Sequence, residues 1–169
     1  MMVEREATVI KIIGPINEDT LSVFLEELDA ESQSQSVVRI LLSSEGGTAL
    51  DALAYVSAIR RCKRRVAVCA TGVVMSAATL ILAAGTKGLR YIHKEAWVMV
   101  HEDSGKVKGT VSQMEREVFR LRRMEDQWCV LLEEYTGTSA KTWSKLHAEG
   151  DTYLSADECL ALGLIDKII

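Results

Sequence analysis

Three polar residues of this sequence stand at places where acyl-transfer chemistry could be assembled. Ser76 lies among small residues just before the apolar run 77–84, where a loop gives way to a buried helix. His101 closes an apolar run, and Asp151 opens a later polar turn. Together they supply a nucleophile, a base and a group that orients the base. The free N–H groups at a helix N-terminus would also favour the oxyanion that forms when the serine attacks a carbonyl.

Each of these residues also has a simpler interpretation. Ser76 could be only a helix N-cap, His101 a hydrogen-bonded histidine at a strand end, and Asp151 a carboxylate in a turn. The other two histidines are weaker candidates, because His93 falls in a basic turn and His147 in a polar amphipathic helix. The order and setting of the three residues therefore carry the prediction, rather than any one of them.

A glycine pair points to the oxyanion site of the same chemistry. Gly46 and Gly47 follow a buried strand, and a backbone amide approaches a ligand closely only where no Cβ intervenes. The N–H of Gly47 and the N–H of Ala77 would together form a two-donor oxyanion hole. The loss of one such donor typically costs about 3 kcal/mol of transition-state stabilisation.

Composition and charge exclude several other classes of function. Lys and Arg number 20 and Asp and Glu 24, so the net charge of −4 argues against nucleic acid as a partner. Residues 1–6 lack the apolar core of a signal peptide, and no apolar run reaches membrane-spanning length. The four cysteines form no Cys-x-x-Cys pair and have no histidine at zinc-ligand spacing. We therefore expect a cytoplasmic protein with no membrane partner, no metal and no cofactor, whose cysteines at 69, 129 and 159 are buried thiols.

The elements that must position the site alternate between strand and helix over the first hundred residues. Continuous apolar strands of this kind indicate a mostly parallel sheet covered by helices, with ligands at the carboxyl ends of the strands. At 169 residues we expect an α/β protein that forms a single domain over 1–169. The predicted strands cover residues 7–13, 37–42, 66–70, 89–92 and 96–100.

A long amphipathic helix is predicted over residues 111–135, where apolar residues recur every three or four positions. At 1.5 Å per residue it would span about 37 Å, which is more than a domain of this size needs for its own core. It either packs along the core or projects and packs against a partner subunit, and we favour the second interpretation.

Several motifs together resemble the ClpP family of serine peptidases, and the resemblance runs from the first strand to Ile169. It implies a crotonase/ClpP-like spiral of ββα units, with Ser76, His101 and Asp151 as the catalytic triad and oxyanion donors at Gly47 and Ala77. The motifs are Ser44-Glu-Gly-Gly47, Gly72-Val-Val-Met-Ser-Ala-Ala78, Leu82-Ala-Ala-Gly-Thr-Lys-Gly-Leu-Arg90, Val98-Met-Val-His101, Asp151-Thr-Tyr-Leu-Ser-Ala156 and Gly163-Leu-Ile-Asp166.

The resemblance also implies an assembly. The helix at 111–135 matches the protruding handle that joins two heptameric rings into a homo-oligomeric chamber, where peptides or unfolded proteins are cleaved. The family engages an AAA+ unfoldase through a segment ahead of the first strand; because this sequence begins almost at that strand, we expect such a partner less firmly than the chamber itself. The family usually has proline where this chain has Glu45, and Gln-Pro where it has Glu102-Asp103. Two alternatives stay open. The chain could be a catalytically silent structural subunit that assembles with an active paralogue, or an enzyme that acts on acyl-CoA thioesters.

Overall fold

The computed structural model describes residues 9–32 and 37–169, which form a mixed α/β fold. The predicted strand at 7–13 therefore begins outside the described residues. The strands are β1 (Val9–Ile13), β2 (Val38–Ser44), β3 (Val66–Met75), β4 (Arg90–Ile92), β5 (Trp97–Val100), β6 (Thr152–Leu154) and β7 (Lys167–Ile168). The helices are α1 (Glu18–Ser32), α2 (Ala49–Arg61), α3 (Ala77–Ala83), α4 (Val111–Thr136), α5 (Ala140–Ala148) and α6 (Ala156–Ala161).

The sheet is parallel except at one edge, as the alternation of strands and helices predicted. Its main path runs β1-β2-β3-β4-β7, while β5 pairs with β3 and β6. The β5–β6 pair alone is antiparallel among the described strand pairs. The predicted α/β fold is thus confirmed, together with its long helix.

The third strand is longer than the sequence suggested. We expected it to end at Ala70, but β3 continues through Gly72 to Met75. Gly72 has φ +59°, a conformation that glycine adopts easily, so the strand changes direction there without ending. The first half of β3 pairs with β4 and the second half with β5, and this brings the end of β3 beside the end of β5.

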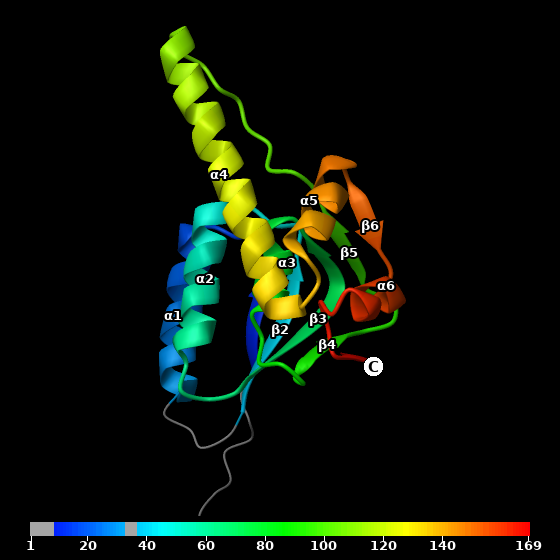
Figure 1. The fold of residues 1–169 in the computed structure, drawn as a ribbon. Coiled ribbons are helices and arrows are strands. Elements are labelled where there is room, and N and C mark those ends of the chain that lie inside the picture. The colour runs from blue at the N-terminus through cyan, green and yellow to red at the C-terminus, as the bar shows by residue number, and fades with distance from the viewer. Residues whose placement is uncertain (1–8, 33–36) are drawn as a thin grey trace, which may run out of the picture.

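Helices cover the sheet because their apolar faces have no other place to be buried. α1 and α2 lie side by side against the first strands (Figure 1). All seven residues of α3 are buried, which explains why the helix has no charged face; its one polar residue, Thr79, donates its hydroxyl hydrogen to the backbone oxygen of Ser76. The helix behind Ser76 is therefore held rigidly by the core.

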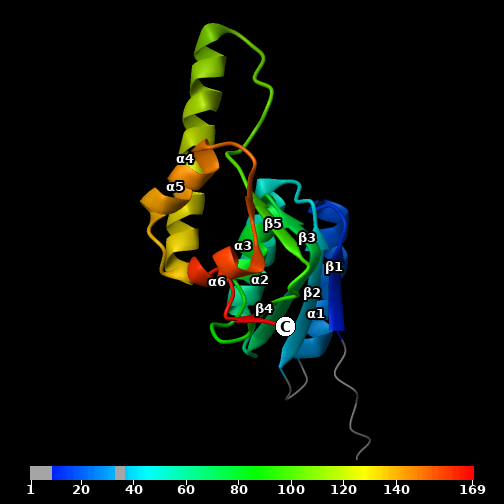
Figure 2. The same ribbon diagram turned by 90° about the vertical axis from the view of Figure 1, so that its right-hand side faces the viewer.

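The predicted long helix is present as α4 and projects beyond the rest of the fold (Figures 1 and 2). Thr110 and Gln113 form a capping box at its start, and Gly137 ends it in the left-handed conformation. Its 26 residues span about 39 Å, and of these only Cys129 and Leu132 are buried. In the described part of the chain, no helix combines the length and the apolarity that crossing a membrane requires.

A buried ion pair fastens the root of α4 to the sheet. Arg90, at the start of β4, is 2% exposed and forms a bidentate pair with Asp166. The same guanidinium donates to the backbone oxygen of Tyr135 in the last turn of α4. This explains in physical terms why an arginine and an aspartate stand at these positions of the matched motifs.

The cysteines are free thiols, but one prediction about them was wrong. Cys129 and Cys159 are buried as expected, whereas Cys69 is only half-buried. Cys69 lies on β3 at a position whose side chain points away from the main core, because β3 alternates between buried and partly exposed residues.

Candidate active site

Strand register brings the three predicted catalytic positions together. In the β3–β5 pair Met75 lies opposite Met99, so Ser76 follows the end of β3 where His101 follows β5. The Ser76 N–H donates to the Met99 oxygen at 2.8 Å, which holds the two chain segments in place. This placement agrees with the expectation that the site would lie at the carboxyl ends of parallel strands.

Ser76 occupies an unusual backbone conformation. Its φ of +52° makes it the only residue other than glycine with positive φ in the described ranges, and such a conformation costs on the order of 1–3 kcal/mol. Ser76 stands at the N-cap position of α3, yet its side chain makes no capping hydrogen bond. Its Oγ lies instead 2.8 Å from His101 Nε2. This is the hydrogen bond that a serine nucleophile and its base require.

Asp151 lies on the other side of the imidazole, but at a longer distance. The antiparallel β5–β6 register pairs Val100 with Thr152, which places Asp151 next to His101. Its Oδ1 is 3.9 Å from His101 Nδ1, and its side chain is 65% exposed. The distance suits an ion pair but is too long for a hydrogen bond. The structure thus brings Asp151 to the expected side of His101 without direct contact.

The glycine loop closes over the start of α3. Gly46 has φ +96°, and a Cβ there would lie 2.8 Å from the Cβ of Ser76, so only glycine fits. Within the described residues, neither the Gly47 N–H nor the Ala77 N–H donates to a protein acceptor. Gly47, Ser76, Ala77 and His101 all line one pocket. Two free N–H groups beside a serine hydroxyl can stabilise a developing oxyanion.

The lining of this pocket also contains residues that the sequence analysis did not predict to belong to a site. Glu125 and Trp128 come from α4, His147 comes from α5, and Asp103 from the segment between β5 and α4. We expected His147 only to lie in a polar amphipathic helix, and in α5 it is 3% exposed. Its burial was not predicted, because α4 packs over the face of α5 that carries His147, and a helical pattern alone does not reveal a helix that covers it.

The carboxyl of Glu125 is anchored in this wall. Burial by itself would raise its pKa, but the hydrogen bond and charge of His147, with help from Cys129 and the backbone of Asp103, hold the pKa below its ordinary value. Glu125 therefore stays ionised at neutral pH. Burial, followed by the nearby Glu125 carboxylate, raises the pKa of the Cys129 thiol to about 12, so that it stays protonated.

Comparison with known protein families agrees with the geometry. The family model of Clp protease matches residues 3–169, which is nearly the whole chain. The chain belongs to the Clp protease family. This membership confirms the resemblance drawn from the motifs and supports, in general terms, a ClpP-like peptidase. Two acidic residues stand where the motifs of the family usually have other residue types. Glu45 is exposed beside the glycine loop, and Asp103 lines the pocket.

Proposed function

We propose that this member of the Clp protease family is a serine endopeptidase that hydrolyses peptide bonds of peptides or unfolded proteins. Ser76 would be the nucleophile, His101 the general base and Asp151 the residue that orients the base. The observation that carries the proposal is the 2.8 Å contact between Ser76 Oγ and His101 Nε2 in a serine with positive φ. Backbone strain of this kind persists where a functional geometry requires it.

The proposed reaction is acylation followed by hydrolysis. His101 Nε2 takes the hydroxyl proton as Ser76 Oγ bonds to the scissile carbonyl carbon, and the resulting oxyanion accepts hydrogen bonds from the N–H groups of Gly47 and Ala77. The imidazolium then gives its proton to the leaving amine as the C–N bond breaks. A water molecule, deprotonated by His101, attacks the acyl-enzyme, and the returned proton restores Ser76.

The role of Asp151 requires a small closure. A movement of about 1 Å would bring its carboxylate within hydrogen-bonding distance of His101 Nδ1. Catalytic hydrogen bonds often tighten only when substrate or partner is bound.

A homo-oligomeric chamber is part of the same proposal. α4 leaves apolar side chains exposed along its projecting half, among them Val111, Val118 and Phe119. A helix with such side chains usually packs against another copy or partner. Sedimentation velocity at micromolar concentration should show a species far larger than a monomer. A strictly monomeric protein would remove the support for α4 as a handle.

The direct test is covalent labelling by a fluorophosphonate, read by intact-mass spectrometry. The native chain should gain one adduct, and Ser76→Ala should gain none. Ser104→Ala is the matched control, because Ser104 is an exposed serine outside the pocket, and it should label like the native chain.

A catalytically silent subunit is the competing function, and two observations favour it. The Asp151 carboxylate is not hydrogen-bonded to His101, and the glycine loop carries the acidic Glu45 in place of the usual proline. If the assembled native protein forms no adduct, this alternative replaces the peptidase. If the native chain and Ser104→Ala label while Ser76→Ala does not, the silent subunit is excluded.

A further inference from the structure

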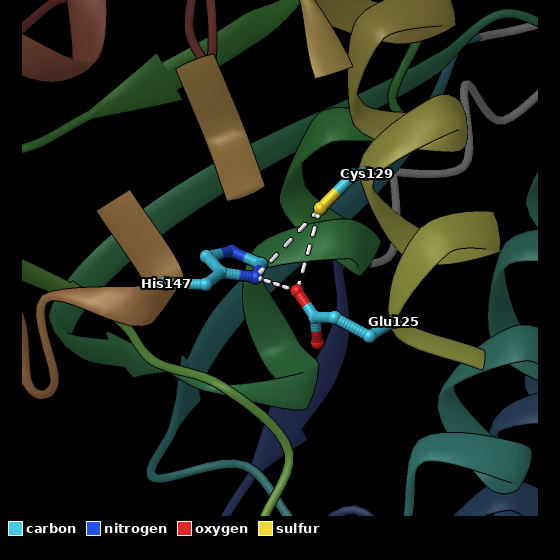
Figure 3. A group of neighbouring side chains, drawn as sticks. All are labelled: Glu125, Cys129 and His147. Atoms are coloured by element: carbon cyan, nitrogen blue, oxygen red, sulfur yellow. Dashed lines mark hydrogen bonds and ion pairs between the residues drawn. The ribbon is translucent and has the colours of Figure 1, made fainter. Parts of the chain in front are cut away.

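A second cluster of reactive side chains adjoins the same pocket, which two of its three members, Glu125 and His147, line together with Ser76. Glu125 and Cys129 stand one helical turn apart on α4, and His147 faces them from α5 (Figure 3). Cys129 and His147 are each 3% exposed, while Glu125 is partly buried. The peptidase mechanism uses none of the three, so their convergence calls for a separate explanation.

The three donor atoms point to one place. Glu125 Oε1 lies 2.5 Å from His147 Nδ1, the Cys129 thiol donates to the same oxygen at 3.3 Å, and Sγ is 4.0 Å from Nδ1. This arrangement does not form a second nucleophilic triad. In a triad the nucleophile and the orienting acid use opposite nitrogens of the histidine, whereas here both approach Nδ1. Donors that converge on one point from three side chains are instead the arrangement of a metal site.

We propose that Glu125, Cys129 and His147 form a binding site for a transition-metal ion of the Zn²⁺ type. Carboxylate, thiolate and imidazole are all ligands of Zn²⁺, and a thiolate disfavours Mg²⁺ and Ca²⁺. The inference goes beyond the proposed peptidase function and departs from our expectation of no metal. A sequence search misses the site because its ligands lie on two helices and do not follow a recognised spacing.

The observed distances are close to those that a bound ion requires. In tetrahedral zinc coordination, ligand atoms lie about 3.3 Å apart for O and N and about 3.5 Å apart when one is sulfur. The Sγ distances of 3.3 and 4.0 Å need small changes, and the 2.5 Å contact between Glu125 and His147 must open by roughly 0.8 Å. Rotation of the Glu125 carboxylate, which is the least buried of the three groups, can supply that change.

Binding of the ion needs no reactant other than the protein, the metal ion and water. The Cys129 thiol loses its proton to solvent as Sγ bonds to the ion, because a coordinated cysteine binds as thiolate. His147 Nδ1 also gives up the hydrogen that it donates to Glu125, so that its lone pair binds the ion while the neutral imidazole keeps its one ring hydrogen on Nε2. Three ligands from the protein leave one position of a tetrahedral ion for water. Glu125 and His147 line the pocket, so that position faces the cavity that also holds Ser76 and His101.

Equilibrium dialysis of the native protein against ZnCl₂ tests the proposal directly. We expect one Zn²⁺ per chain and no saturable binding of Mg²⁺ under the same conditions. Loading with Co²⁺ should produce a thiolate-to-metal charge-transfer band in the near ultraviolet. Absence of saturable zinc binding, or of that band in the cobalt-loaded native chain, would overturn the site without reference to any variant.

Variants then assign the ligands. Cys129→Ala and Glu125→Gln should each weaken zinc binding at least about 10-fold. Cys159→Ala is the matched control, because Cys159 is an equally buried free thiol on α6, away from the cluster, and should bind zinc like the native chain. Native-like affinity in Cys129→Ala, or equal loss in Cys159→Ala, would overturn the assignment. Thermal unfolding of each variant shows whether it is folded.

A consequence for the pocket rests on the proposed peptidase function. Saturating Zn²⁺ should slow fluorophosphonate labelling of Ser76 in the native chain, because the ion and its water would occupy part of the pocket that the reagent must enter. Cys129→Ala, which leaves the pocket lining intact, should label at its zinc-free rate. Equal slowing in both proteins would overturn inhibition through this site. If the native chain never labels, the peptidase proposal fails, and dialysis still decides the metal site.

Discussion

Replacing Asp166 by asparagine should destabilise the fold far more than its place near the C-terminus suggests. The Asp166 carboxylate accepts hydrogen bonds from the backbone N–H groups of Gly88 and Arg90 and from two nitrogens of the Arg90 guanidinium. An asparagine keeps one oxygen but turns an NH₂ group toward a guanidinium that is 2% exposed. The variant therefore loses a charged hydrogen bond and leaves a buried cation without its counter-ion.

The burial of Arg90 sets the size of the expected loss in the free energy of unfolding. A charged hydrogen bond contributes about 1.5–3 kcal/mol, and breaking a buried pair on one side costs about 3–5 kcal/mol in all. For a protein of 169 residues this loss lowers Tm by roughly 6–20 °C. The control is Glu95→Gln in the exposed Lys94–Glu95 pair, which should stay within about 0.5 kcal/mol of the native protein.

The dependence on pH gives a second check with a definite sign. Burial opposes ionisation of Asp166, but the hydrogen bonds and charge of Arg90 outweigh it and hold the carboxyl pKa below the ordinary 3.8. A lowered folded pKa stabilises the protein above pH 3.8, and that stability is lost as the pH falls through the folded pKa. The gap between the native protein and Asp166→Asn should therefore narrow in strong acid.

Urea unfolding followed by circular dichroism measures both effects, with protein concentration held constant because assembly contributes to apparent stability. A loss below about 1 kcal/mol at pH 7, or a gap that widens in acid, would refute the argument that burial of Arg90 sets the size of the effect.

Two further predictions concern the pocket and the thiols. Gly47→Ala would place a Cβ 2.2 Å from the backbone oxygen of Ile16, so the glycine loop must shift. In a variant that still unfolds cooperatively, fluorophosphonate labelling should slow by about 10²-fold or more. Labelling at the native rate would contradict a role for this loop in stabilising the oxyanion. Burial, with a smaller contribution from nearby carboxylates, raises the pKa of Cys129 and of Cys159 to about 12. At pH 8 a thiol reagent should therefore modify Cys62 first and spare both buried thiols until urea unfolds the chain, as peptide mass mapping would show.

Local patterns in the sequence were enough to predict the sheet, the long helix and the residues of the candidate triad. Strands and helices can be predicted from the spacing of apolar residues along the sequence, and this spacing can be read without knowing the fold. Ser76, His101 and Asp151 could be singled out because each stands where an element begins or ends. In a parallel sheet such positions gather at one edge, and the β3–β5 register brings the first two into contact.

Tertiary structure alone decided the features that depend on which helix covers which. The sequence pattern placed His147 in a polar amphipathic helix, but only the packing of α4 over α5 shows that it is buried against Glu125 and Cys129. The 3.9 Å separation of Asp151 from His101 likewise depends on the β5–β6 pairing and the turn before it. The physical reason is the same in both cases. Residue type and period report what one element prefers, whereas distances between side chains on different elements arise only when the elements pack.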